Sequence, residues 1–191
     1  MARIALDIDS TLHHYWELFR SIVRDRHGVD LAYEEQTSWG ITAIPEPVLR
    51  AAVSESHSDA NIAAAEPYPD AVETVQAWHA HGHWIHVTSH RAESCAAATA
   101  RWLDAVGIPF DDLRCSFDKV TRCVELGIDV LVDDSPVNLE RARNEGILGA
   151  TLVHPWNREL SGTDGIVLAN DWKELRELLE PRLERLQESA R

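Results

Sequence analysis

Acidic residues are grouped at two places in the sequence, each at the end of a short apolar run. The first group, DIDST at Asp7–Thr11, follows the run that begins at Arg3. In the second, LVDDSP, Asp133 and Asp134 end another run. Three or four carboxylates that lie close together repel one another unless protons or a cation compensate, and hard oxygen ligands favour magnesium. The strand ends of a parallel sheet lie side by side, so the two groups predict a magnesium site.

Hydroxyl and cationic side chains follow two further apolar runs. The segment VTSHR ends a run with Thr88 and Ser89, which suit a phosphate oxygen together with backbone N–H groups at a helix start. The segment FDK supplies Lys119, whose ammonium would neutralise both a carboxylate nucleophile and an incoming phosphoryl group. An exposed position at a helix start is the alternative for Lys119. A surface role is likewise the alternative to substrate contact for His90 and Arg91.

Short apolar runs alternate with segments of helical spacing along most of the chain. Such runs are typical of the buried strands of a parallel sheet, and helices between them return the chain to the next strand. The alternation predicts an α/β fold with a doubly wound parallel sheet. The expected strands are Arg3–Ile8, Trp84–Thr88, Leu113–Phe117, Val130–Val132, Thr151–Val153 and Ile166–Leu168, and the expected helices are Asp70–His81, Ala92–Val106, Lys119–Leu126, Val137–Asn144 and a tail from Asp171 that is interrupted near Pro181.

One interval breaks this alternation. Roughly seventy residues separate the first expected strand from the second, whereas a crossover needs only about a dozen. Within the interval, Leu12–His27 and Pro45–His57 have helical spacing, and Pro69 marks the return to the sheet. The sequence therefore predicts a small helical cap at residues 11–67, inserted into a core formed by residues 1–10 and 68–191.

Composition and charge restrict the class of partner. Hydrophobic residues make up 45% and charged residues 26% of the 191, which is typical of a folded domain. The net charge of −14 disfavours nucleic acid polymers and anionic membranes, but a cation in a cleft would still admit a small phosphorylated substrate. Three cysteines without CxxC spacing, and no secretory or membrane segment at the N-terminus, predict a cytoplasmic protein. No pattern supports a homodimer.

Taken in order, DxDxT, a strand-end hydroxyl, a lone lysine and an aspartate pair resemble the four motifs of the haloacid dehalogenase superfamily. The insertion, TSHR and VDDSPVNL are also similar to bacterial relatives of the 5'(3')-deoxyribonucleotidases. The resemblance implies a Rossmannoid core and a Mg²⁺-dependent phosphomonoesterase, and the narrower likeness implies nucleoside monophosphates as substrates. Ser10 departs from the glycine that many members carry, although a small polar residue can still make the turn.

The same resemblance implies roles for the residues that match its motifs. Asp7 would be the nucleophile that forms an aspartyl-phosphate, and Asp9 the acid to the leaving group and then the base to water. A covalent intermediate divides one difficult displacement into two easier ones. The residues implied to hold the phosphate are Thr88, Ser89, His90 and Lys119, and those implied to hold Mg²⁺ are Asp7, the backbone carbonyl of Asp9, Asp134, and Asp133 directly or through water.

Aromatic and histidine residues leave alternatives open. Trp16, Phe19 and Trp39 lie in the expected cap, where they would either stack a nucleobase over the cleft or form the small core of the cap itself. Four histidines lie close together in the sequence but straddle a helix end and a strand, so we expect their side chains to diverge, with three at the surface and one in the sheet. They are His79, His81, His83 and His86.

Two competing functions follow from the same residues. The first is the same chemistry on another small metabolite, such as a sugar phosphate, because cap shape decides the substrate. The second is a protein that takes up or binds phosphate without turnover, such as a signalling receiver. Receivers carry no long insertion after their first strand, and Asp7, Asp9, Lys119 and Asp134 together favour turnover.

Overall fold

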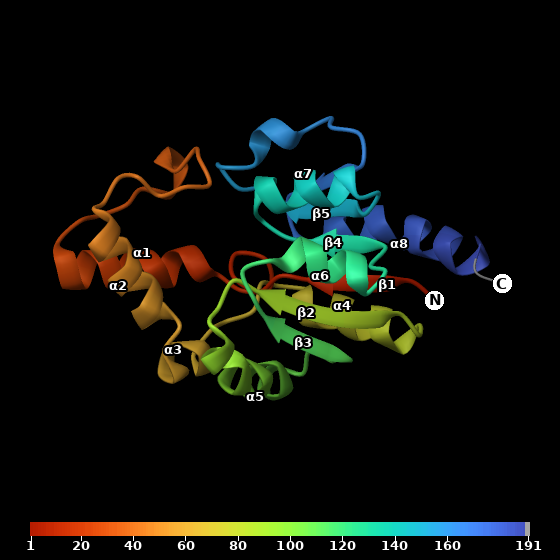
Figure 1. Ribbon diagram of the computed structural model, residues 1–191, viewed down its shortest axis with the longest axis horizontal. Coiled ribbons are helices and arrows are strands. Elements are labelled where there is room, and N and C mark those ends of the chain that lie inside the picture. Colours follow the sequence, from red (N-terminus) through yellow and green to blue (C-terminus); the bar gives the residue numbers. More distant parts are fainter. Residues whose placement is uncertain (190–191) are drawn as a thin grey trace.

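A parallel sheet forms the centre of the computed structural model, which describes residues 1–189 (Figure 1). Its six strands have the order β3-β2-β1-β4-β5-β6, and every neighbouring pair is parallel. The first strand lies between β2 and β4, so the chain winds outward in both directions, which confirms the expected fold class. The strands are β1 (Arg3–Leu6), β2 (Trp84–Ser89), β3 (Asp112–Cys115), β4 (Val130–Val132), β5 (Leu148–Leu152) and β6 (Ile166–Ala169).

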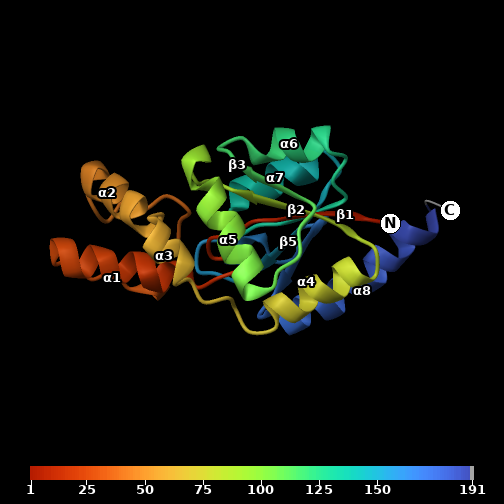
Figure 2. The ribbon, with the colours of Figure 1, turned by 90° about the horizontal axis from the view of Figure 1, so that it is seen from below.

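Helices cover both faces of this sheet (Figure 2). One face carries α4 (Ala71–Ala80), α5 (Ala96–Val106) and α8 (Trp172–Ser189), and the other carries α6 (Lys119–Glu125) and α7 (Pro136–Asn144). Short 3-10 helices lie at Glu93–Cys95 and Arg158–Leu160. None of the described helices is long and apolar enough to span a bilayer.

Side-chain alternation in β1 explains why both faces are covered. Ile4 and Leu6 pack into the larger hydrophobic cluster with Trp78 of α4, whereas Ala5 packs into the opposite cluster with Val120 of α6. Successive side chains of a strand point to opposite faces, so a strand that is apolar throughout needs a helical layer on each side. This double burial fixes β1 in the middle of the sheet.

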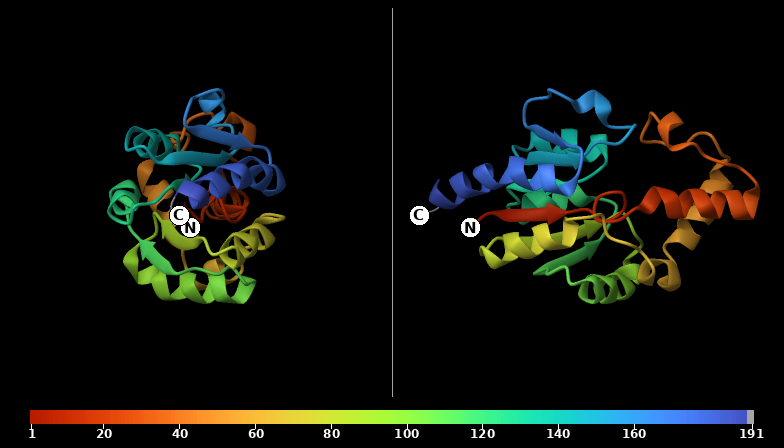
Figure 3. Two further views of the ribbon diagram at one scale, coloured as in Figure 1. Left: turned by 90° about the vertical axis from the view of Figure 1, so that its right-hand side faces the viewer. Right: turned by 180° about the vertical axis from the view of Figure 1, so that it is seen from behind.

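The segment between β1 and α4 forms a group of helices beyond the C-terminal ends of the strands, on the far side from both termini in the right-hand view of Figure 3. The two ends of this segment lie side by side, since His13 forms a β-bridge with Pro67. These helices have their own hydrophobic cluster, which includes Phe19 and Val23. The division at residues 11–67 into core and cap remains a prediction. The elements are α1 (Tyr15–His27), η1 (Tyr33–Glu35), α2 (Glu46–Ser56) and α3 (Asp59–Ala63).

Several element boundaries differ from the sequence expectation. The first strand ends at Leu6 instead of Ile8, because the chain turns sharply there. The third ends before Phe117, whose side chain is 75% exposed. The fifth begins earlier than Thr151, because Gly149 interrupts the apolar run yet belongs to the strand. A Cβ at Gly149 would lie 3.1 Å from Leu139 of α7, so the missing side chain permits close packing.

Two local expectations are wrong because tertiary packing overrides them. The C-terminal helix is continuous through Pro181, since buried Leu179 and Leu183 anchor it on both sides of the proline. His83 is buried rather than at the surface, and its Nδ1 accepts a hydrogen bond from the Ala2 backbone N–H at 3.3 Å. His79 and His81 are exposed and His86 is buried in the sheet, as expected.

Candidate active site

The two acid groups lie together because their strands are neighbours. In the parallel register Leu6 pairs with Val132, and the Asp7 N–H donates to the Val132 carbonyl at 2.8 Å. Asp7, Asp133 and Asp134 therefore leave the sheet at its C-terminal edge, with one carboxylate oxygen of each within 4.8 Å of the others. Among the residues that the structure describes, no other group of three or more acids, histidines or cysteines comes this close.

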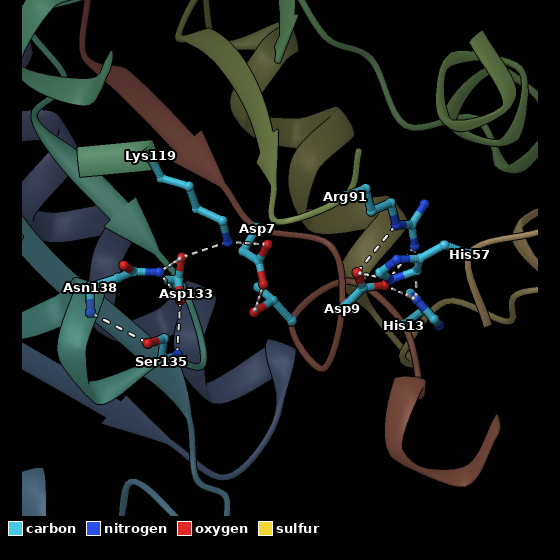
Figure 4. A network of polar contacts seen from close by, with 10 residues as sticks. Asp7, Asp9, His13, His57, Arg91, Lys119, Asp133, Ser135 and Asn138 are labelled. Carbon is cyan, nitrogen blue, oxygen red and sulfur yellow. Dashed lines mark hydrogen bonds and ion pairs between the residues drawn. The ribbon is translucent and has the colours of Figure 1, made fainter. Parts of the chain in front are cut away.

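Lys119 is buried between these carboxylates (Figure 4). Its Nζ donates to Asp7 Oδ1 at 2.5 Å and to Asp133 Oδ2 at 3.0 Å. Asp133 also accepts from the Ser135 backbone N–H at 2.8 Å and from Asn138 Nδ2 at 3.2 Å. The alternative of an exposed lysine is wrong, because only 2% of the residue is accessible.

Burial and mutual repulsion dominate the electrostatics of this group. Burial raises the pKa of Asp7 to about 7, against the lowering effect of Lys119 and with further raising by Asp133. Burial, followed by the charges of Asp7 and Asp133, raises the pKa of Asp134 well above its usual range. Burial acts to lower the pKa of Lys119, but its two carboxylate partners outweigh that effect and raise it.

These residues fit a divalent cation. Asp134 Oδ1 is buried and has no hydrogen-bond partner in the part of the chain that the structure describes. A buried acceptor without a donor costs free energy, and so does uncompensated negative charge in a buried site. A hard cation bound by Asp7 and Asp134 would satisfy both, because carboxylate oxygens are the ligands that Mg²⁺ prefers. Asp133 fits less well as a direct ligand, since both of its oxygens accept hydrogen bonds of 3.0 Å or less from protein groups, whereas Asp7 Oδ2 has only the Thr11 hydroxyl at 3.5 Å.

The Asp9 carboxylate lies apart from this group, within a cluster of cationic and imidazole side chains (Figure 4). The Arg91 guanidinium donates to both oxygens of Asp9, from Nη2 to Oδ1 at 2.6 Å and from Nε to Oδ2 at 3.2 Å. His13 Nε2 lies 2.8 Å from Oδ1, and His57 Nε2 lies 3.2 Å from Oδ2. Burial acts to raise the pKa of Asp9, but Arg91 and hydrogen bonds from both histidines lower it well below its usual range. Asp9 is therefore held ionised in this arrangement.

Of the residues expected to hold the phosphate at the end of β2, only some line the cavity described below. Thr88 and Ser89 end β2 as predicted, and both are fully buried. Their hydroxyls have no hydrogen-bond partner among the described residues, and neither residue lines the cavity described below. His90 does line it and stacks on Phe117, with 6.0 Å between ring centroids. Arg91 contacts Asp9 instead, and the sequence offered no signal for that pairing.

A cavity of about 360 Å³ opens above Asp7 and Lys119. Trp16 and Trp39 from the inserted segment line it, but Phe19 does not, because it is fully buried in the cluster of that segment. For Phe19 the position therefore agrees with the alternative role, as part of a small core within the inserted segment. The other lining residues are Asp9, Ser10, Tyr15, Gln36, Gly40, Ile41, Leu49, Val53, His57, His90, Phe117, Asp134 and Trp156.

Trp156 was not expected from the sequence. It lies in the loop after β5, where its indole Nε1 donates to the Asp134 backbone carbonyl at 3.2 Å. Its ring lies 5.8 Å from that of Trp16 and 6.4 Å from that of Trp39, measured between centroids. The signal that points to it is its place in HPWN, directly after a strand that ends at the same edge as β1 and β4.

Comparisons with known proteins agree with this geometry. Residues 1–185 match the family described as 5' nucleotidase, deoxy (pyrimidine), cytosolic type C protein. A "Putative 5'(3')-deoxyribonucleotidase" of Chlorobaculum tepidum is 25% identical over 172 residues, covering 82% of this chain and 81% of that protein. A "Putative nucleotidase" of Bacillus cereus is 23% identical over 196 residues, covering 95% and 100%.

The fold is also found among solved structures. A haloacid dehalogenase-like family hydrolase from Streptococcus pneumoniae superimposes with a TM-score of 0.66, covering 95% of this chain and 98% of that one, at 15% sequence identity. At this identity the superposition shows only a shared fold, whereas the family match extends over nearly the whole sequence. The chain belongs to the cytosolic type C 5' nucleotidase family and is a phosphoric monoester hydrolase, and its fold is similar to that of a haloacid dehalogenase-like hydrolase.

Proposed function

We propose that this protein is a Mg²⁺-dependent phosphomonoesterase that hydrolyses nucleoside monophosphates through an aspartyl-phosphate on Asp7. One observation carries the proposal: a buried carboxylate and a buried ammonium lie at the floor of a cavity that three tryptophans help to line. The polar floor suits a phosphate, and the aromatic walls suit a planar base.

In the first step a carboxylate oxygen of Asp7 attacks phosphorus, and the bond from phosphorus to the ester oxygen breaks. Lys119 holds Asp7 in place and offsets the charge that would otherwise repel the phosphate. Mg²⁺, held by Asp7, Asp134 and the Asp9 carbonyl, with Asp133 acting through water, would neutralise further negative charge on the phosphoryl group. In the second step water attacks the aspartyl-phosphate and releases inorganic phosphate.

Asp9 supplies the proton to the leaving oxygen and takes one from the attacking water. Its ionised state suits the second task directly. To protonate the leaving oxygen, Asp9 must first bind a proton and break its hydrogen bonds with Arg91, because that contact stabilises only the ionised carboxylate. Proton transfer to the leaving group is therefore the step that requires a rearrangement of this cluster.

The composition of the cavity favours a monophosphate with a flat, largely apolar leaving group. Lys119 is the only lysine or arginine among the described residues that line the cavity, so there is no second cation for another phosphate. Away from the floor the walls include Ile41, Leu49 and Val53. A sugar phosphate would bring hydroxyls against these apolar groups, and each hydroxyl left without a partner costs binding free energy.

The test is phosphate release from purified protein, measured on nucleoside monophosphates, sugar phosphates and p-nitrophenyl phosphate, each with Mg²⁺ and with EDTA. We expect release to require Mg²⁺ and to be fastest with nucleotides. Asp7→Asn should abolish it without loss of fold, whereas Asp104→Asn, at an exposed position on α5, should leave it unchanged.

Each alternative predicts a different result. Preference for a sugar phosphate would keep the aspartyl-phosphate chemistry and remove the base-stacking role of the tryptophans. Equal rates with EDTA would exclude the metal. Substantial activity in Asp7→Asn would exclude the covalent intermediate. The cytoplasm remains the expected compartment, consistent with Cys95, Cys115 and Cys123 being free thiols.

A further inference from the structure

A buried histidine joins the inserted segment to the catalytic loop. His154, in the loop after β5, is 3% exposed and makes two hydrogen bonds through its ring. Its Nε2 lies 2.8 Å from the backbone carbonyl of Ser10, and its Nδ1 lies 2.7 Å from the hydroxyl of Tyr33 in η1. The ring also stacks on Trp156 at 4.6 Å, with 5° between planes.

The chemistry of these partners fixes the proton positions. A carbonyl oxygen only accepts, so Nε2 must carry the hydrogen that binds Ser10. A neutral imidazole has one donor and one acceptor, so Nδ1 accepts from the Tyr33 hydroxyl. Burial lowers the pKa of His154 to about 4, so the ring is neutral at neutral pH. The result is a directional chain from Tyr33 through His154 to Ser10.

Ser10 is the residue at which the catalytic loop needs support. Its φ is +61°, a left-handed conformation that a non-glycine residue adopts at a cost. The turn around it is tight, because the Ile8 carbonyl accepts from the N–H groups of Thr11, Leu12 and His13. Holding the Ser10 carbonyl fixes the peptide plane after Ser10, which the two backbone dihedrals of Ser10 link to the plane that carries the Asp9 carbonyl.

The same loop supports the second acidic strand end. The Trp156 indole and the Asn157 side-chain amide each donate to the Asp134 backbone carbonyl at 3.2 Å. The loop at residues 154–157 thus holds the turn after β1 through His154, and the turn after β4 through Trp156 and Asn157. It contains no carboxylate itself.

We propose that His154 is a positioning residue: its Nε2–H fixes the Ser10 turn so that the Asp9 carbonyl and the carboxylates of Asp7 and Asp134 face one cation. The inference rests on the proposed function for its kinetic readout. The Ser10 carbonyl sets the tautomer of His154, and the Tyr33 hydroxyl, from the inserted segment, donates to Nδ1 and orients the ring. A change at Tyr33 should therefore act through His154.

The variants separate hydrogen bonding from packing. His154→Phe keeps an aromatic ring to stack on Trp156 but removes both hydrogen bonds, whereas the amide of His154→Gln can again donate to Ser10. Groups that support metal ligands typically contribute about 10- to 100-fold in metal affinity or activity. We expect His154→Phe to weaken Mg²⁺ binding and lower kcat within that range with little change in KM, and His154→Gln to recover most of both. His83→Phe, which removes another buried histidine, should change neither.

Two readouts need no turnover. Calorimetric titration measures Mg²⁺ affinity without substrate, and ¹H–¹⁵N spectra of the imidazole rings show whether His154 carries its proton on Nε2. Tyr33→Phe should shift that ring signal and weaken Mg²⁺ binding less than His154→Phe does. If no substrate is hydrolysed, the proposed function fails, but these two measurements still decide the role of His154.

Three results would overturn the inference. One is wild-type Mg²⁺ affinity and kcat in His154→Phe. Another is a proton on Nδ1 in the wild-type protein. The third is a loss in His154→Phe that His154→Gln does not restore although both variants keep the wild-type melting temperature, since the hydrogen bond to Ser10 would then not explain the effect.

Discussion

The acidic floor of the site should destabilise the protein when no metal is bound, and Asp7→Asn should relieve that effect. Burial raises the pKa of Asp7 from its ordinary value of 3.8 to about 7. Between these values the unfolded chain is ionised while the folded protein keeps the proton, so folding stability falls as pH rises. The difference corresponds to about 4 kcal/mol of unfolding free energy, lost between about pH 4 and pH 7.

Asparagine does not ionise, so the variant lacks this penalty. In EDTA we expect the two proteins to be similar in stability near pH 4, and the variant to be more stable near pH 7 by up to about 4 kcal/mol. Asp134 contributes in the same direction, because the charge of Asp7 is one of the causes that raise its pKa. With Mg²⁺ the order should reverse, since a cation bound to the folded state stabilises the wild-type carboxylates.

Urea unfolding followed by tryptophan fluorescence measures these free energies, at several pH values and with EDTA or Mg²⁺. The difference between the two proteins reports on Asp7 and on Asp134, whose pKa depends on the charge of Asp7, because more distant titrating groups, such as His154, contribute to both. A difference that stays constant from pH 4 to pH 7 in EDTA would refute the argument from burial. So would a wild-type protein that is more stable than the variant at pH 7 without metal.

Three further predictions concern single side chains. Asp9→Asn should slow hydrolysis of alkyl phosphates by about 10²-fold or more, and of p-nitrophenyl phosphate less, because nitrophenolate leaves without a proton; equal losses on both would argue against the acid role. Trp16→Ala should raise KM for a nucleoside monophosphate by about 5- to 150-fold but not for a short alkyl phosphate, as steady-state kinetics would show. Pro181→Ala should raise the free energy of unfolding by about 1–3 kcal/mol, since it restores a backbone donor within α8; unchanged urea unfolding would contradict this.

The sequence by itself determined the class of fold and the location of the chemistry. Apolar runs are local signals, and an acid directly after such a run lies at the C-terminal edge whatever the order of the strands. Asp7 and Asp133 could therefore be placed together before their strands were known to pair. Among the strands only the boundaries differ from the expectation, as at Gly149, where a residue without a side chain interrupts the apolar pattern within a strand.

The tertiary structure decided which side chains act on those acids. Arg91 binds Asp9 from 82 positions away, Lys119 binds Asp7 from 112, and His154 holds Ser10 from 144. Lys119 was expected from the resemblance of its motif. No local pattern, however, distinguishes an arginine that binds Asp9 from one that faces solvent, or a histidine that supports a turn from one that packs in the core. Such roles depend on which loops share the edge of the sheet, and packing of the whole chain decides that.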